Sequence, residues 1–205
     1  MLDGANPTSG TGKASEGNGR ERVLSEAELS AVLRALSDDP FSEIIRLLVL
    51  TGQRRSEIGG LKWSEVDLDR GLIVLPPERC KNGRQHELPI SHQVRAVLER
   101  QPQRNEWVWG CEWSSWSEPK AKLDRQLNGM APWTMHDLRR SCATHMADRL
   151  DVLPHVVEAV LNHHSGHRAG VAGIYQRAKY QDQMKAALQA YGDWIDNLKS
   201  APEAG

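Results

Sequence analysis

Residues 41–61, FSEIIRLLVLTGQRRSEIGGL, join a strongly apolar run to an abrupt polar turn. The apolar residues between Phe41 and Thr51, namely Phe41, Ile44, Ile45, Leu47, Leu48, Val49 and Leu50, leave little polar face, which predicts a largely buried helix. Gly52 follows this run directly and favours a left-handed helix cap, because glycine adopts a positive φ at little cost. The next residues, Arg54 to Leu61, have the pattern of a second, short helix. The stretch therefore predicts a buried helix, a sharp turn and a polar helix start.

The segments on either side predict more helices and one small sheet. A capping-box pattern at Ser25 and Glu28 begins an expected helix over residues 25–37. Residues 72–75 and 86–90 are strand-like and flank the polar turn CKNGR. Further helices are expected over residues 92–101, 118–128, 135–149, 153–161, 169–178 and 181–198. Many helices with one small antiparallel sheet indicate an α+β fold.

Length and composition are those of one globular domain. The chain has 205 residues, of which 39% are hydrophobic, enough for a single buried core. Residues 1–22 are rich in Gly, Ser, Asn and Thr, so we expect a flexible linker there and one domain over residues 23–200. No apolar run is long enough to cross a bilayer and no signal peptide is recognisable, which favours a cytoplasmic protein without membrane partners. Its widely spaced cysteines, Cys80, Cys111 and Cys142, are expected to be reduced thiols.

The net charge of -1 gives no support to nucleic-acid binding, so such a function has to rest on local charge. Residues 139–179 hold six basic residues against three acidic ones: Arg139, Arg140, Arg149, Arg168, Arg177 and Lys179 against Asp148, Asp151 and Glu158. We interpret this stretch as a candidate phosphate-facing surface.

Each chemically interesting residue also has an ordinary structural interpretation. Arg54 could simply form an ion pair with a neighbouring carboxylate, and a lone tyrosine such as Tyr175 is usually a packing residue. His136 and Arg139 lie three apart on one predicted helix face, where they could grip a phosphate or pair with Asp137. A metal site in the histidine-rich segment 161–167 remains an alternative, but no metal-binding spacing accompanies it. No metal or cofactor is therefore expected.

Taken together, five segments in order resemble the signature blocks of tyrosine recombinases and phage integrases. These are TGQRRSEIGGLKW, CKNGRQHELPIS, HDLRRSCATHMA, VLNHHSG and GVAGIYQRAKY. The resemblance spans about residues 23–198 and implies a mainly helical catalytic domain. It implies six catalytic residues: Arg54, Lys81, His136, Arg139, His163 and the nucleophile Tyr175. Tyr180 is the rival nucleophile, and Asn162 stands where many members have Gly.

The resemblance further implies a site-specific recombinase that cuts and rejoins double-stranded DNA through a 3'-phosphotyrosyl intermediate. It implies a homotetramer on paired sites, weakly associated or monomeric without DNA. The amino-terminal core-binding domain usual in the family is not recognisable in this sequence. Two alternatives are a catalytically idle DNA-binding module and an enzyme similar to type IB topoisomerases; a metal-dependent hydrolase is a third.

Residues 184–198 carry an apolar stripe with helical spacing. In the resembling family such tails dock on a neighbouring protomer. The alternative is that the stripe packs on its own core.

Overall fold

The computed structural model of the chain describes residues 22–163 and 172–200, with side chains described for residues 22–163 and 180–200. The described residues form these α-helices: α1 (Glu26–Ala35), α2 (Pro40–Thr51), α3 (Arg55–Gly59), α4 (His92–Glu99), α5 (Ser117–Gln126), α6 (Met135–Leu150), α7 (Pro154–Val160) and α8 (Ala172–Ser200). They also form two 3-10 turns, η1 (Trp63–Glu65) and η2 (Pro77–Arg79). The predicted linker, apart from Arg22, lies outside the described residues.

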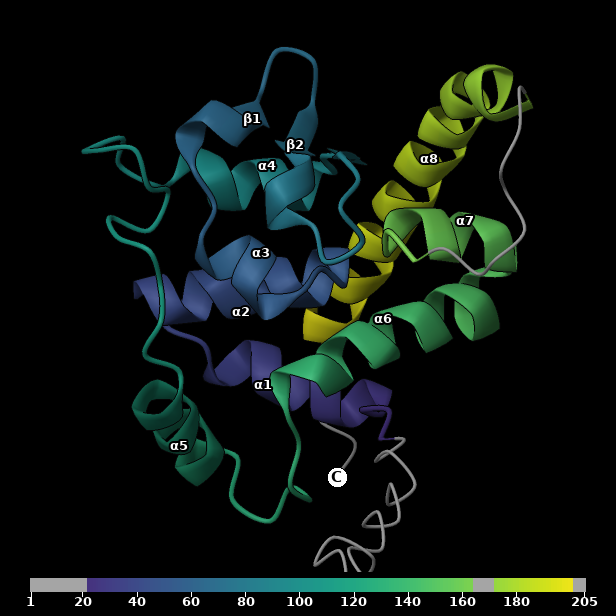
Figure 1. The fold of residues 1–205 in the computed structure, drawn as a ribbon. Coiled ribbons are helices and arrows are strands. Elements are labelled where there is room, and N and C mark those ends of the chain that lie inside the picture. Colours follow the sequence, from purple (N-terminus) through teal and green to yellow (C-terminus); the bar gives the residue numbers. More distant parts are fainter. Residues whose placement is uncertain (1–21, 164–171, 201–205) are drawn as a thin grey trace, which may run out of the picture.

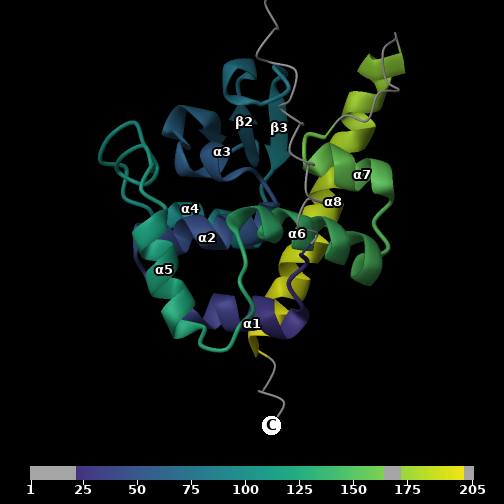
Figure 2. The same cartoon turned by 60° about the horizontal axis from the view of Figure 1, so that its bottom comes forward.

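Helix α2 is the centre of the fold, as its apolar sequence predicts. It contacts α3, α4, α6 and α8, and ten of its residues are buried. Asp39 caps its start by accepting a hydrogen bond from the amide of Ser42, and Gly52 ends it with a φ of 62°. Figure 2 places the sheet and α3 on one side of α2 and α1 on the other.

The sheet has three antiparallel strands in the order β1 (Val66–Asp67), β2 (Leu72–Leu75), β3 (His86–Pro89). The predicted hairpin is confirmed, with Ile73 opposite Leu88 and both side chains fully buried. The sequence did not predict β1, because two residues give too short a pattern to detect. With this addition, the expected α+β class is correct.

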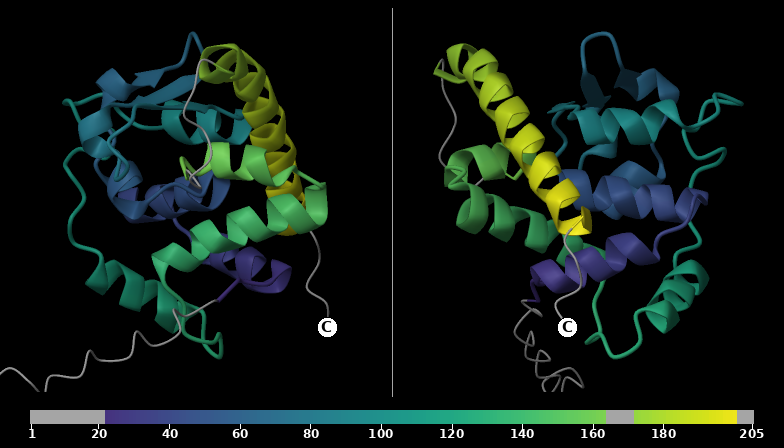
Figure 3. Two further views of the ribbon diagram at one scale, coloured as in Figure 1. Left: turned by 45° about the vertical axis from the view of Figure 1, so that its right-hand side comes forward. Right: turned by 180° about the vertical axis from the view of Figure 1, so that it is seen from behind.

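The chain from Ala172 to Ser200 is one helix, whereas two helices with a break near residue 180 were expected. This prediction was wrong because the sequence RAKYQDQ holds no glycine or proline to interrupt a helix. Tyr180 instead continues α8 and packs edge-on against His155 of α7, with ring centroids 5.6 Å apart. Figures 1 and 3 show α8 crossing the whole molecule as one straight element.

The apolar stripe of α8 packs on the chain's own core, so the second alternative for this segment is confirmed. Four members of the stripe are buried, and two are partly buried and packed against the core: Met184, Leu188, Tyr191 and Ile195, and then Trp194 and Leu198. The far end of α8 is bound to α1, because the Ser30 hydroxyl donates to the carbonyl of Leu198 at 2.7 Å. No helix in the described part of the chain is long and apolar enough to cross a membrane.

Candidate active site

The turn between α2 and α3 presents Arg54 beside a buried carboxylate. Arg54 is the N-cap residue of α3, and its guanidinium donates to Glu57 Oε1 at 2.8 Å. The other Glu57 oxygen accepts the backbone amide of Arg54 at 3.0 Å, so one carboxylate fixes both ends of the residue. The Arg54 side chain remains 22% exposed while that of Glu57 is 1% exposed. Arg54 therefore does form the ion pair that the ordinary interpretation predicted. Part of its guanidinium nevertheless stays accessible to a ligand.

Arg139 of α6 contacts the same turn. Its guanidinium donates to the carbonyl of Gly52 at 2.8 Å and to that of Leu161 at 2.5 Å. Burial, followed by the charge of Arg54, lowers the pKa of Arg139 to about 10, so the residue still carries its proton at neutral pH. The expectation that Arg139 lies on an exposed phosphate-facing surface is corrected, because it is only 7% exposed.

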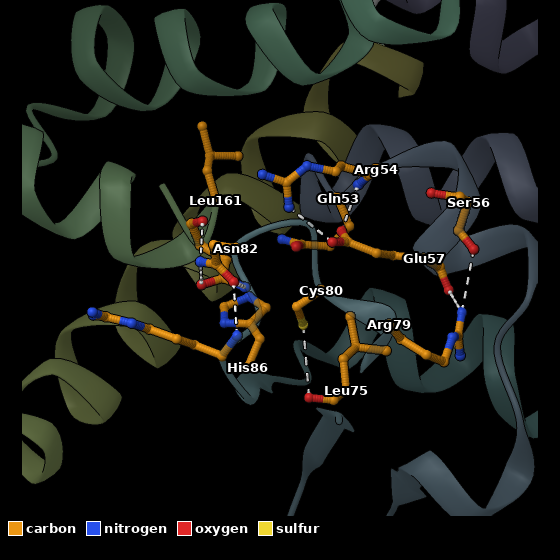
Figure 4. A network of polar contacts seen from close by, with 12 residues as sticks. Gln53, Arg54, Ser56, Glu57, Leu75, Arg79, Cys80, Asn82, His86 and Leu161 are labelled. Carbon is orange, nitrogen blue, oxygen red and sulfur yellow. Dashed lines mark hydrogen bonds and ion pairs between the residues drawn. The ribbon is translucent and has the colours of Figure 1, made fainter. Parts of the chain in front are cut away.

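The last residue of α7 and the turn after it hold these parts together through their backbone carbonyls. Val160 O accepts Gln53 Nε2 at 2.8 Å and lies 3.1 Å from His86 Nε2. The next carbonyl, Leu161 O, takes the bond from Arg139. Figure 4 shows Gln53, from the α2–α3 turn, and His86, from the sheet, on the side of this segment that carries Leu161.

The hairpin that carries Lys81 is fixed at two points. Arg79 donates to the carbonyl of Glu57 at 2.7 Å, which joins η2 to α3. Asn82 Nδ2 donates to Asn162 Oδ1 at 2.8 Å, which joins the tip of the hairpin to the turn after α7 (Figure 4). Lys81 is exposed in this turn, and His163 is exposed directly after Asn162. Both predicted residues thus border one hydrogen-bonded contact.

His136 lies in the first turn of α6 and is exposed. Its pKa is lowered first by partial desolvation and then by the charges of Arg140, Arg139 and Arg54, against the opposing charge of Asp137. The imidazole is therefore neutral at pH 7 and able to accept a proton. Asp137 forms an ion pair with Arg140 at 3.2 Å, so the predicted alternative of pairing within this helix concerns Arg140 rather than Arg139.

The structure brings five of the six predicted residues around the α2–α3 turn, the hairpin tip and the start of α6. Tyr175 belongs to the first turn of α8, and its side chain lies outside the described ones. The first turns of α8 extend past α7 and away from α3 in Figures 1, 2 and 3. The structure therefore does not place this part of α8 beside the other five residues.

Several residues that build the site were not identified from the sequence. Gln53, Glu57, Asn82 and His86 make bonds within the site that span up to 107 positions of the chain. Of these, Glu57 bonds directly to a predicted residue, Arg54. Glu57 had a detectable signal, since an acidic residue three positions after an N-cap is typical of a capping box. The other three carry no local pattern.

Among residues 22–163 and 180–200, no group of histidine, cysteine and acidic side chains has a geometry suited to a metal ion. His164 and His167 lie outside the described residues. The three cysteines are free, as expected; Cys80 and Cys142 are buried and Cys111 is exposed.

Comparison with known proteins agrees with this arrangement. The model of the phage integrase family matches residues 22–182. The prophage integrase IntZ of Escherichia coli (strain K12) is 28% identical over 187 residues, which cover 84% of this chain and 44% of IntZ. The tyrosine recombinase XerA of Pyrococcus furiosus is 24% identical over 198 residues, covering 86% of this chain and 64% of XerA.

A crystal structure of XerA recombinase shares the fold, with a TM-score of 0.53 and 18% identity over 83% of this chain and 66% of that one. The chain spans less than half the length of the prophage integrase and about two thirds of XerA.

Proposed function

The chain belongs to the phage integrase family, and from this premise we propose that it is the DNA-cleaving part of a site-specific recombinase. The proposed substrate is double-stranded DNA, cut and rejoined through a 3'-phosphotyrosyl intermediate. Full recombination would need a homotetramer on paired sites, with weak association or monomers in the absence of DNA. The proposed substrate, intermediate and assembly concern the whole protein, and they are inferred from the chemistry of the candidate catalytic residues.

The observation that carries the proposal is an excess of positive charge at the α2–α3 turn. Arg54 lies close enough to Arg139 for its charge to lower the pKa of Arg139, in addition to the effect of burial. The negative charge of Glu57, which pairs with Arg54, offsets part of this positive charge. A phosphodiester gains negative charge on its nonbridging oxygens when an oxygen nucleophile attacks it, so a preorganised donor such as Arg54, with the charge of Arg139 beside it, stabilises the transition state. Each donor of this kind contributes about 3 kcal/mol, roughly a hundredfold in rate.

The remaining candidates supply the two proton transfers. A phenol with a pKa near ~10 is a poor nucleophile at neutral pH, and the neutral His136 can take its proton. As Tyr175 Oη forms a bond to phosphorus, the bond to the 5' oxygen breaks, and the ammonium of Lys81 gives that oxygen a proton. His163 would donate to a nonbridging oxygen. The phosphotyrosyl bond conserves the energy of the broken bond, so a second 5' hydroxyl can reverse the step without ATP.

The test is covalent capture on nicked duplexes, whose short 5' fragment diffuses away after cleavage and prevents religation. Because the target sequence is unknown, the duplexes carry a randomised central region. We expect a protein–DNA adduct that survives denaturing detergent and forms in the presence of EDTA. No adduct, with noncovalent binding intact, would overturn the enzymatic assignment.

A DNA-binding module without cleavage is the second candidate. The observation that favours it is the direction of the first turns of α8, which extend away from α3 in Figures 1 and 2. Relaxation of a supercoiled plasmid without strand exchange would instead favour an activity similar to that of type IB topoisomerases.

A further inference from the structure

The bond between Asn82 and Asn162 joins two parts of the site that are 80 positions apart in the sequence. Asn82 Nδ2 donates to Asn162 Oδ1 at 2.8 Å and also lies 3.2 Å from the Asn162 carbonyl oxygen. We propose that this contact, the asparagine clamp, positions Lys81 for proton donation to the departing 5' oxygen. The proposal rests on the function proposed above and adds two positioning residues to it.

Geometry gives the clamp its influence over Lys81. Lys81 directly precedes Asn82, and His163 directly follows Asn162. Because neighbouring Cα atoms are about 3.8 Å apart, the backbone of each residue lies close to the clamp. Lys81 itself is exposed in a turn, and a long lysine side chain on an unrestrained turn samples many positions. Arg79 already fixes the start of this turn to α3. The clamp fixes its tip, so the lysine can explore only a small region beside His163.

The backbone at position 162 explains why asparagine serves here. Asn162 has a φ of 49°, in the left-handed region that favours glycine and, among other residues, asparagine. Glycine would satisfy the backbone equally well but would have no side chain to accept the bond. Asparagine thus meets the backbone requirement and supplies the acceptor.

Asn82 has a second, separable role in the turn itself. Its Oδ1 accepts a hydrogen bond from the backbone amide of Arg84 at 3.2 Å, while its Nδ2 makes the clamp.

The two roles can be separated by substitution. Asn82→Asp keeps the oxygen that accepts from Arg84 and removes the donor to Asn162. Asn162→Gly removes the 2.8 Å side-chain bond of the clamp, keeps the left-handed φ and leaves only the longer 3.2 Å contact with the backbone carbonyl. Gln85→Ala is the matched control, because the Gln85 side chain is exposed and bonds to Glu87 within the same hairpin.

Single-turnover covalent capture is then compared on two nicked duplexes, one with the normal 5' oxygen at the cut and one with a 5' bridging sulfur. A thiolate leaves without a proton, so the sulfur substrate does not need the lysine. We expect both clamp variants to form adduct about tenfold more slowly on the oxygen substrate and at the wild-type rate on sulfur. Gln85→Ala should match wild type on both. In a Lys81→Ala background, Asn82→Asp should cause no further loss.

Equal slowing on oxygen and sulfur would overturn the proposal, because it would indicate a general structural defect. Wild-type rates on both substrates would also overturn it while leaving the proposed function intact.

Hydrogen exchange of residues 80–85 tests the clamp independently of activity. Losing one hydrogen bond should speed exchange there by about three- to tenfold in Asn162→Gly but not in Gln85→Ala. Unchanged exchange would show that the clamp does not restrain the hairpin. If wild type forms no adduct on either substrate, the proposed function fails, and with it the role assigned to the clamp.

Discussion

At the scale of single residues, the site consists of cations whose environments differ. Arg54 is partly exposed and shares a carboxylate, whereas Arg139 is buried and bonded to two backbone carbonyls. The accessible arginine is thus suited to direct phosphate contact, and the buried one supplies charge and holds the turn.

Arg54→Lys tests the direct contact, because lysine keeps the charge beside Glu57 but loses the planar fork. We expect covalent capture to slow by about a hundredfold, the value of one lost transition-state donor. The melting temperature should change little, since the ion pair can persist. The control is Arg55→Lys, the same exchange at the exposed neighbour that lies over the Trp116 ring. Equal effects at both positions would argue against a specific role for Arg54.

The pH dependence of cleavage tests His136. Its pKa is lowered below the ordinary 6.5, so the neutral, proton-accepting form persists as the pH falls through 6.5. The rate of adduct formation should therefore decline only below pH 6.5, and His136→Asn should remove that decline together with most of the rate. A wild-type decline centred above pH 6.5 would contradict the assignment of His136 as the base.

At the scale of elements, the end of α2 is the position where the fold and the site depend on each other. Gly52 has a positive φ, its carbonyl holds Arg139, and a Cβ there would lie 2.8 Å from Leu161 Cδ2 and 2.9 Å from Cys142 Sγ. The sequence predicted the helix cap correctly. It could not predict the close approach, because Cys142 and Leu161 reach Gly52 only in the folded chain.

Gly52→Ala should reduce the free energy of unfolding by about 1–3 kcal/mol, through both an unfavourable φ and the steric clash. Gly129→Ala is the control, since Gly129 also has a positive φ but nothing within 4 Å of an added Cβ. Urea unfolding should give a clearly larger loss at Gly52. Equal losses would mean that only φ matters there.

The burial of the α8 stripe in the chain's own core makes a separate prediction about stability. Leu188 is 1% exposed, so Leu188→Ala should cost about 2–5 kcal/mol of unfolding free energy. Lys185→Ala, at an exposed position of the same helix, should change stability by less than about 0.5 kcal/mol. Unchanged stability of Leu188→Ala, with altered self-association, would favour docking between protomers instead.

At the scale of the whole molecule, local patterns in the sequence predicted the hairpin, the order of the signature blocks and the helices, except that α8 is one helix and not two. Apolar periodicity and capping residues act over a few positions, so a single sequence is enough to read them. The clamp, the carbonyls of the turn after α7 and the burial of Arg139 depend on contacts between distant segments. Those contacts became visible only in the structure, and they connect the segments that carry Lys81, Arg54 and Arg139.

The central claim is that Tyr175 is the nucleophile, and peptide mapping of the adduct tests it most directly. The three tyrosines of the chain fall in three different tryptic peptides: residues 169–177 with Tyr175, 180–185 with Tyr180 and 186–199 with Tyr191. After capture on nicked DNA and nuclease digestion, mass spectrometry should find the nucleotide on peptide 169–177. Tyr175→Phe should form no adduct and still bind DNA, whereas Tyr180→Phe should form it normally. A nucleotide on peptide 180–185, or an adduct with Tyr175→Phe, would contradict the account.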